Sequence, residues 1–143
     1  MNQVQSPPPT TARLVLWSIA AEPLFLAALA LFLNRLGTLP RDGAPPDGDV
    51  MLIVFSALSL GALWAGFRFA AGGFAPKRPS FSTEPAMPTF GHQIAAVALA
   101  AVPGMLGFVH YLLYGMDWVL LAFCLGGFAA AARHALFFGS GPG

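Results

Sequence analysis

The stretch from Leu14 to Asn34 reads LVLWSIAAEPLFLAALALFLN, and Glu22 carries its only charged side chain. An α-helix needs about 20 apolar residues to cross the ~30 Å of hydrocarbon in a bilayer. The run is longer than the apolar core of a cleaved signal peptide, which has about 7–15 residues. We therefore expect a transmembrane helix that is retained in the protein.

Three further apolar runs have a similar length, and they are Val50 to Phe67, Gln93 to Tyr114 and Trp118 to Phe138. Lipid offers no partner for backbone N–H and C=O groups, so such runs must be helical. Only 9% of the 143 residues are charged, against about 25% in a soluble domain. The sequence thus predicts an all-α integral membrane protein with four transmembrane helices, surrounded by lipid.

The linkers divide the chain into two predicted antiparallel hairpins. The predicted segments are a disordered N-terminus (1–12), a first transmembrane hairpin (13–69), a Pro-rich cytoplasmic linker (70–91), a second transmembrane hairpin (92–138) and a disordered tail (139–143). A faint repeat, in which Ala20 to Pro23 matches Ala100 to Pro103, suggests that the hairpins share an ancestor. Chance matching among Ala, Leu and Gly is the alternative explanation.

Lysine and arginine predict the orientation. The side that holds both termini and the second loop carries five of the seven basic residues, namely Arg13, Arg68, Lys77, Arg78 and Arg133. The opposite side carries Arg35 and Arg41. Because cytoplasmic loops are enriched in basic residues, we expect both termini to be cytoplasmic, in a bacterial cytoplasmic membrane.

Glu22 is the residue most suggestive of function. It follows Arg13 by nine residues, which places it about 13 Å into the membrane. A carboxylate at this depth usually turns inward toward a partner or water. Pro23 leaves the carbonyl of Ile19 without its helical donor, so the two groups could bind a proton or a small cation. Alternatively, Glu22 is simply protonated, or it pairs with Arg133 and joins two helices.

The segment Ala100 to Leu113, AAVPGMLGFVHYLL, and more loosely Ala20 to Leu33, resemble the carboxylate-bearing helix of rotary ATPase proteolipid (c-type) subunits. In that family an acidic residue of this helix carries H⁺ or Na⁺. The resemblance implies that Glu22 is the ion carrier, with Val102 in the corresponding place of the second hairpin. The chain lacks the family's regular Gly-x-Gly-x-Gly pattern, so the likeness suggests a related type of helix rather than a rotor subunit.

Two histidines raise a different hypothesis. His92 opens the third apolar run and His134 falls near the end of the fourth. In an antiparallel hairpin both imidazoles would lie near the cytoplasmic face, where they could hold a haem b iron from two sides. The alternative is that both are interfacial side chains without a ligand, since amphipathic residues favour that position.

Small residues recur every four positions in the second and fourth runs. The two stripes are centred on Gly61 and Gly126, and Gly127 lies beside the second. Such stripes let helices approach closely in lipid. They predict packing seams, either inside the bundle or toward a partner protein.

The remaining composition excludes several classes of function. A single cysteine, Cys124, rules out an internal disulfide, and a net charge of +1 offers no basic surface for nucleic acid. We find no nucleophile–base pair, phosphate loop or metal motif, so we expect neither an enzyme nor a cofactor. The sequence favours a structural or accessory subunit of a membrane assembly, with a protein partner or a second copy as neighbour. The alternatives are proton or cation handling through Glu22, and a haem b electron-transfer subunit.

Overall fold

The computed structural model describes residues 9–38, 50–71 and 90–139, and all regular structure in these ranges is α-helical. The helices are α1 (Pro9–Arg35), α2 (Val50–Ala70), α3 (Phe90–Tyr114) and α4 (Asp117–Gly139). Each is long and apolar enough to span a membrane. The prediction of a four-helix, all-α membrane protein is therefore confirmed at the level of the helices.

The helix ends differ slightly from the predicted boundaries. α1 begins at Pro9, inside the stretch predicted to be disordered, because proline is tolerated in the first turn of a helix. α3 begins at Phe90, two residues before the predicted hairpin. The remaining parts of the predicted N-terminus, linker and tail, residues 1–8, 72–89 and 140–143, lie outside the described residues.

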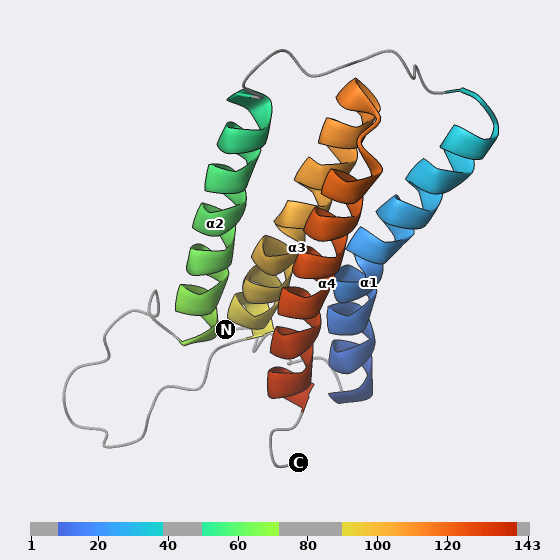
Figure 1. The fold of residues 1–143 in the computed structure, drawn as a ribbon. Helices are drawn as coiled ribbons and strands as arrows, with labels where there is room; N and C mark the ends of the chain where they lie inside the picture. The colour runs from blue at the N-terminus through green and yellow to red at the C-terminus, as the bar shows by residue number, and fades with distance from the viewer. Residues whose placement is uncertain (1–8, 39–49, 72–89, 140–143) are drawn as a thin grey trace, which may run out of the picture.

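Successive helices run in opposite directions, so α1 begins at the end of the bundle where α4 finishes (Figure 1). The tightest connection joins α3 to α4. Gly115 adopts a φ of 68°, and its N–H donates to the carbonyl of Tyr111 at 2.8 Å. A glycine in this left-handed conformation is a common helix C-cap. Asp117 then opens α4, where a carboxylate favours the helix dipole.

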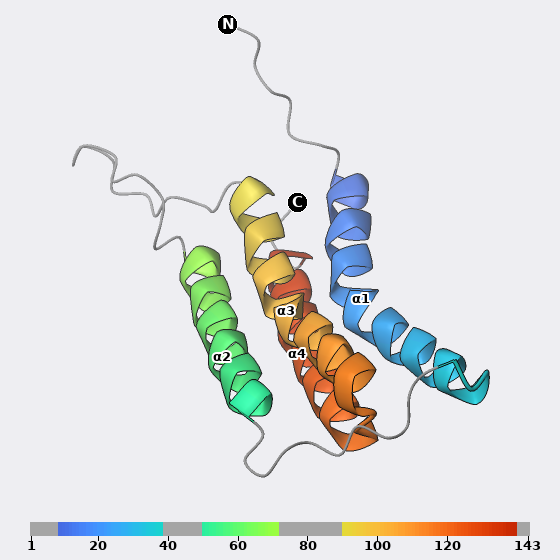
Figure 2. The same cartoon turned by 90° about the horizontal axis from the view of Figure 1, so that it is seen from above.

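α3 occupies the centre of the bundle. It packs against α4, α2 and α1, and α1 also packs against α4. Both views place α1 and α2 on opposite sides of the α3–α4 pair (Figures 1 and 2). Among the described residues, α1 and α2 make no extensive contact. The two helices of the predicted first hairpin are thus separated by the second.

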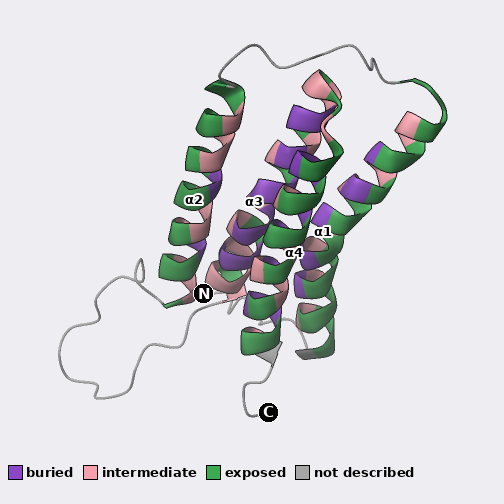
Figure 3. Cartoon of the chain, viewed as in Figure 1, coloured by how far each residue is buried: buried purple, intermediate pink, exposed green. Residues whose placement is uncertain are grey.

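The core consists mainly of small side chains. Alanines of α1, α3 and α4 form most of one buried cluster, together with Leu16 and Val97. A second cluster surrounds Tyr111, Leu120 and Cys124. Half of the α3 span is buried but only 11% of the α2 span. The large exposed apolar residues therefore face outward, as lipid permits (Figure 3).

A very close contact between helices lies in the middle of α3. A Cβ atom added to Gly104 would lie 2.5 Å from the Cβ of Pro23 in α1. On another side of Gly104, a Cβ added to Gly127 of α4 would lie 3.0 Å from the Gly104 nitrogen. α1 bends partway along its length (Figure 2), and Pro23 is the proline inside that helix. Small residues thus bring three backbones together, as in many membrane bundles.

Gly61 and Gly126 do not take part in this packing. Both are exposed, and a Cβ atom added to either would meet no atom within 4 Å. The interpretation that they pack inside the bundle is therefore wrong. Adjacent helical residues point about 100° apart, so Gly127 faces α3 while Gly126 faces away from it. Contact of Gly61 and Gly126 with a partner protein stays a prediction.

Candidate functional site

Glu22 lies at the outer edge of α1 and not deep in the bundle. Its side chain is half-buried, and it borders a shallow hollow formed by α1 alone, with Ser18, Ile19, Ala21 and Phe25. The next residue, Pro23, is fully buried against α3. The bend of α1 thus directs Pro23 toward α3 and leaves the Glu22 carboxyl group near the outer surface of the bundle.

Arg133 points away from Glu22. Ala131 and Ala135 of α4 share a buried cluster with Leu16 of α1, and residues two apart on a helix point about 200° apart. Arg133 lies between these two alanines, so it projects toward α2, where its guanidinium carbon is 5.3 Å from the ring centroid of Phe67. In the part of the chain that the structure describes, Glu22 and Arg133 form no ion pair. The structure therefore does not contain the predicted charge pair.

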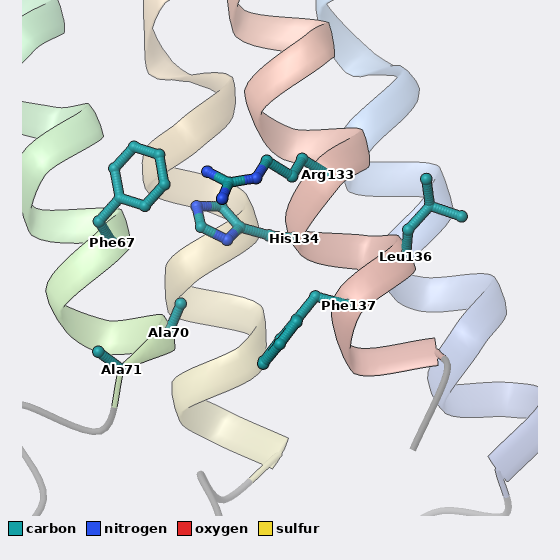
Figure 4. A pocket seen from close by; sticks show the side chains of 7 residues that line it. All are labelled: Phe67, Ala70, Ala71, Arg133, His134, Leu136 and Phe137. Atoms are coloured by element: carbon teal, nitrogen blue, oxygen red, sulfur yellow. The ribbon is translucent and has the colours of Figure 1, made fainter. Parts of the chain in front are cut away.

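Arg133 belongs instead to a pocket between α2 and α4 at the end of the bundle where α1 begins (Figure 4). We call it the Arg133 pocket. Its volume is about 550 Å³, and its walls are Phe67, Ala70, Ala71, Arg133, His134, Leu136 and Phe137. The lining is apolar apart from one guanidinium and one imidazole.

His134 is the buried polar group of this pocket. Its side chain is 4% exposed, and its Nε2 atom has no hydrogen-bond partner within the described part of the protein. The imidazole is held by Phe67, edge to face at 5.0 Å between centroids, and by Phe138, stacked at 6.4 Å. Two rings thus fix an imidazole whose Nε2 atom makes no hydrogen bond within the described residues.

His92, the other predicted haem ligand, lies elsewhere. It packs against Phe69 of α2 with 5.8 Å between ring centroids, and it does not line the Arg133 pocket. In the described ranges no group of three or more His, Cys, Asp or Glu residues could hold a metal ion. These contacts give the haem hypothesis no support.

A second hollow lies nearer the middle of the membrane, between α2 and α4 and over Pro103 of α3. We call it the Ser59 groove. It is open and has a volume of about 310 Å³, and its walls are Ser56, Ser59, Leu60, Leu63, Pro103, Ala122, Phe123 and Gly126. Ser59 is only 7% exposed, and its Oγ atom finds no hydrogen-bond partner in the described residues. Sequence reasoning missed both serines, although hydroxyls three residues apart in an apolar run are a visible signal.

Among the described residues, the charged side chains at the end of the bundle near the Arg133 pocket are all positive. Arg13, Arg68 and Arg133 lie toward this end, at the start of α1 and toward the ends of α2 and α4. The described chain holds two carboxylates, Glu22 and Asp117. Asp117 begins α4 at the opposite end, and Glu22 does not meet Arg133. The Arg133 guanidinium therefore has no carboxylate partner among the described residues.

Comparison with known proteins identifies no relative. No family model matches the chain, and searches of curated proteins and of solved structures gave no match. The likeness of Ala100 to Leu113 to a proteolipid helix thus remains local, and function has to be inferred from the geometry of the bundle.

Proposed function

We propose that the protein is an accessory subunit of a membrane assembly and that its Ser59 groove receives a transmembrane helix of a partner protein. The observation that carries the proposal is the buried Ser59 hydroxyl, which has no hydrogen-bond partner in the described ranges of the chain. A buried polar group without a partner is costly in an apolar medium. A partner helix would supply the missing acceptor or donor if its docking turned this hydroxyl, which is buried in the chain by itself, toward the groove.

The shape of the groove suits a helix. α2 packs mainly on α3 and has no extensive contact with α4, so α2 and α4 leave an opening between them over Pro103 of α3. Gly126 at the rim has open space where a side chain would be. Helices in lipid associate through such small residues because their backbones can approach closely.

The chemistry of the groove indicates what the partner helix should carry. Ser56 and Ser59 provide hydroxyls at its wall, and each hydroxyl both donates and accepts. A matching helix would have a small residue opposite Gly126 and a Ser, Thr, Asn or Gln side chain opposite Ser59. Hydrogen bonds between helices in lipid contribute about 0.6 kcal/mol on average, so the polar contact adds specificity to the packing.

Site-specific photo-crosslinking in native membranes tests the proposal. A photoreactive residue at Leu60, which lines the groove, should give one discrete adduct with another protein. The matched control is Leu58, which is also exposed but lies about 200° around α2, and it should give none. Gly126→Leu should abolish the Leu60 adduct. An adduct of twice the mass of the chain, or equal adducts from both positions, would overturn the proposal.

Proton or cation handling by Glu22 is the second candidate. It is favoured by the absence of an ion pair with Arg133 and by the neighbouring bend at Pro23, where the carbonyl of Ile19 loses its usual amide donor. Glu22→Gln should then abolish proton or cation flux into vesicles that contain the purified protein, whereas Glu22→Asp should retain part of it. Equal flux with Gln and Glu would exclude the role.

A further inference from the structure

We infer that the Arg133 pocket binds the phosphate headgroup of an anionic phospholipid, with the acyl chains lying along the outer face of α4. The inference is independent of the proposed partner helix, because it concerns a different hollow at one end of the bundle. Its basis is the combination of a guanidinium without a carboxylate partner in the described chain, a buried imidazole whose Nε2 has no hydrogen-bond partner there, and apolar walls that open to lipid.

The guanidinium supplies the attraction. Arg133 has no carboxylate partner in the described chain, and a cation within a membrane span normally pairs with another group or reaches toward the interface. Arg133 precedes Gly139, the last residue of α4, by six residues, so its Cα lies about 9 Å from the end of α4. From this depth the side chain can reach the phosphate layer. A guanidinium binds phosphate oxygens through two parallel N–H groups.

The His134 imidazole adds a second hydrogen-bond donor beside the Arg133 guanidinium. His134 is held between Phe67 and Phe138 and cannot turn toward water without losing both ring contacts. His134 lines the same pocket as Arg133 (Figure 4), and its Nε2 atom is buried, so a bound group would reach this nitrogen only after a small shift of the surrounding side chains. A neutral imidazole donates from one ring nitrogen, so Nε2–H can donate to a second phosphate oxygen. The two side chains would thus hold one phosphate group from two directions.

The apolar part of the pocket points to a lipid and not to free phosphate. Leu136 and Phe137 line the pocket and are 59% and 66% exposed, so an acyl chain could continue from the pocket onto the surface of α4. The volume of about 550 Å³ lies in the usual range of small-molecule sites, ~300–1,000 Å³. Basic pockets between transmembrane helices are known lipid headgroup sites. An inorganic anion would leave the apolar walls uncovered.

Native mass spectrometry of the full chain measures this binding directly. Phosphatidylglycerol and phosphatidylcholine with identical acyl chains are added in defined amounts to the purified protein in detergent. We expect one phosphatidylglycerol to be retained per chain, and Arg133→Gln to weaken it by at least about tenfold, since it removes a charged hydrogen-bonding partner. Arg133→Lys keeps the charge but loses the two-point contact, so it should fall between these limits.

Arg68→Gln is the matched control. Arg68 is an exposed arginine toward the same end of the bundle, and its guanidinium carbon lies 6.0 Å from the Trp64 ring centroid, outside the pocket. Its loss should leave phosphatidylglycerol binding unchanged. Equal retention of both lipids, or equal weakening by Arg68→Gln and Arg133→Gln, would show diffuse attraction and overturn the site.

Two further measurements distinguish binding of the whole lipid from binding of phosphate alone, and loss of the site from misfolding of the variant. Inorganic phosphate at millimolar concentration should not displace the lipid, and a chain that binds phosphate but not phosphatidylglycerol would contradict the inference. A photoreactive phosphatidylglycerol should label the α4 segment that contains Leu136 and Phe137, and His134→Leu should reduce that labelling while the thermal unfolding of the protein stays cooperative. Labelling spread evenly over the four helices would reject the pocket.

Discussion

Pro23 of α1 packs directly on Gly104 of α3, so closely that a single added carbon at Gly104 would lie 2.5 Å from the proline Cβ. The bend of α1, the middle of α3 and Gly127 of α4 meet at this point. Leu16 and Ala20 pack on α3 and α4 before the bend, and Ala27 and Ala30 pack after it. The contact thus fixes the position of α1 on the bundle.

Gly104→Ala should destabilise the protein. The new methyl group collides with Pro23, and overpacking of a core typically costs about 1–3 kcal/mol. The higher helix propensity of alanine returns only about 1 kcal/mol. Gly126→Ala is the matched control, since it gains the same propensity in open space. Thermal unfolding in detergent should give a lower midpoint for the first variant and an equal or higher midpoint for the second. Equal midpoints would mean that α1 is not seated on Gly104.

The charge pair between Glu22 and Arg133 was a reasonable expectation that the structure contradicts, and a double-mutant cycle can test the correction. Glu22→Gln and Arg133→Gln should have additive effects on the free energy of unfolding, within about 0.3–0.5 kcal/mol. The reason is that the Arg133 guanidinium lies over Phe67, on the side of α4 that faces α2. A coupling free energy above ~1 kcal/mol would restore the pair.

The orientation in the membrane follows from charge and stays a prediction. The alternating helices place the start of α1 and the end of α4 together (Figure 1), and five of the seven basic residues belong to that side. A reporter fused to Gly143 should therefore be cytoplasmic, and one inserted at Gly43 should be external. An external Gly143 together with a cytoplasmic Gly43 would show that the orientation in the membrane is the reverse of the predicted one. The Arg133 pocket would then face the external leaflet.

The four spans were predictable because lipid forces a long apolar run to form a helix. The packing between the spans was not. In a soluble helix the apolar face points inward, whereas here the outer face is apolar too, so periodicity does not show which side of α2 or α4 is buried. Gly126 and Gly127 are adjacent and identical in sequence, yet only Gly127 meets α3.

The candidate sites were predictable only in part, for the same reason. Arg133 and His134 stood out as rare polar residues in an apolar run, but their partners depend on where α2 lies. Phe67, which contacts both side chains, carries no signal in the sequence. Ser59 is a small hydroxyl of a kind that usually bonds to its own helix, and its unused oxygen becomes visible only in the folded chain.

Ser59→Ala separates the role of this residue in folding from its proposed role in assembly. The Ser59 hydroxyl is buried and has no hydrogen-bond partner among the described residues of the isolated chain. Removing such a group relieves its desolvation cost and leaves no other group unpaired. The thermal midpoint of the purified variant should therefore equal or exceed that of the wild type.

If a partner helix binds the hydroxyl, the same substitution should lower the yield of the Leu60 photo-adduct in native membranes. Leu58→Ala, on an exposed face outside the groove, should leave that yield unchanged. A lower midpoint for Ser59→Ala in the isolated protein would instead show that the hydroxyl serves the bundle itself, and the argument for a helix in the groove would lose its main support.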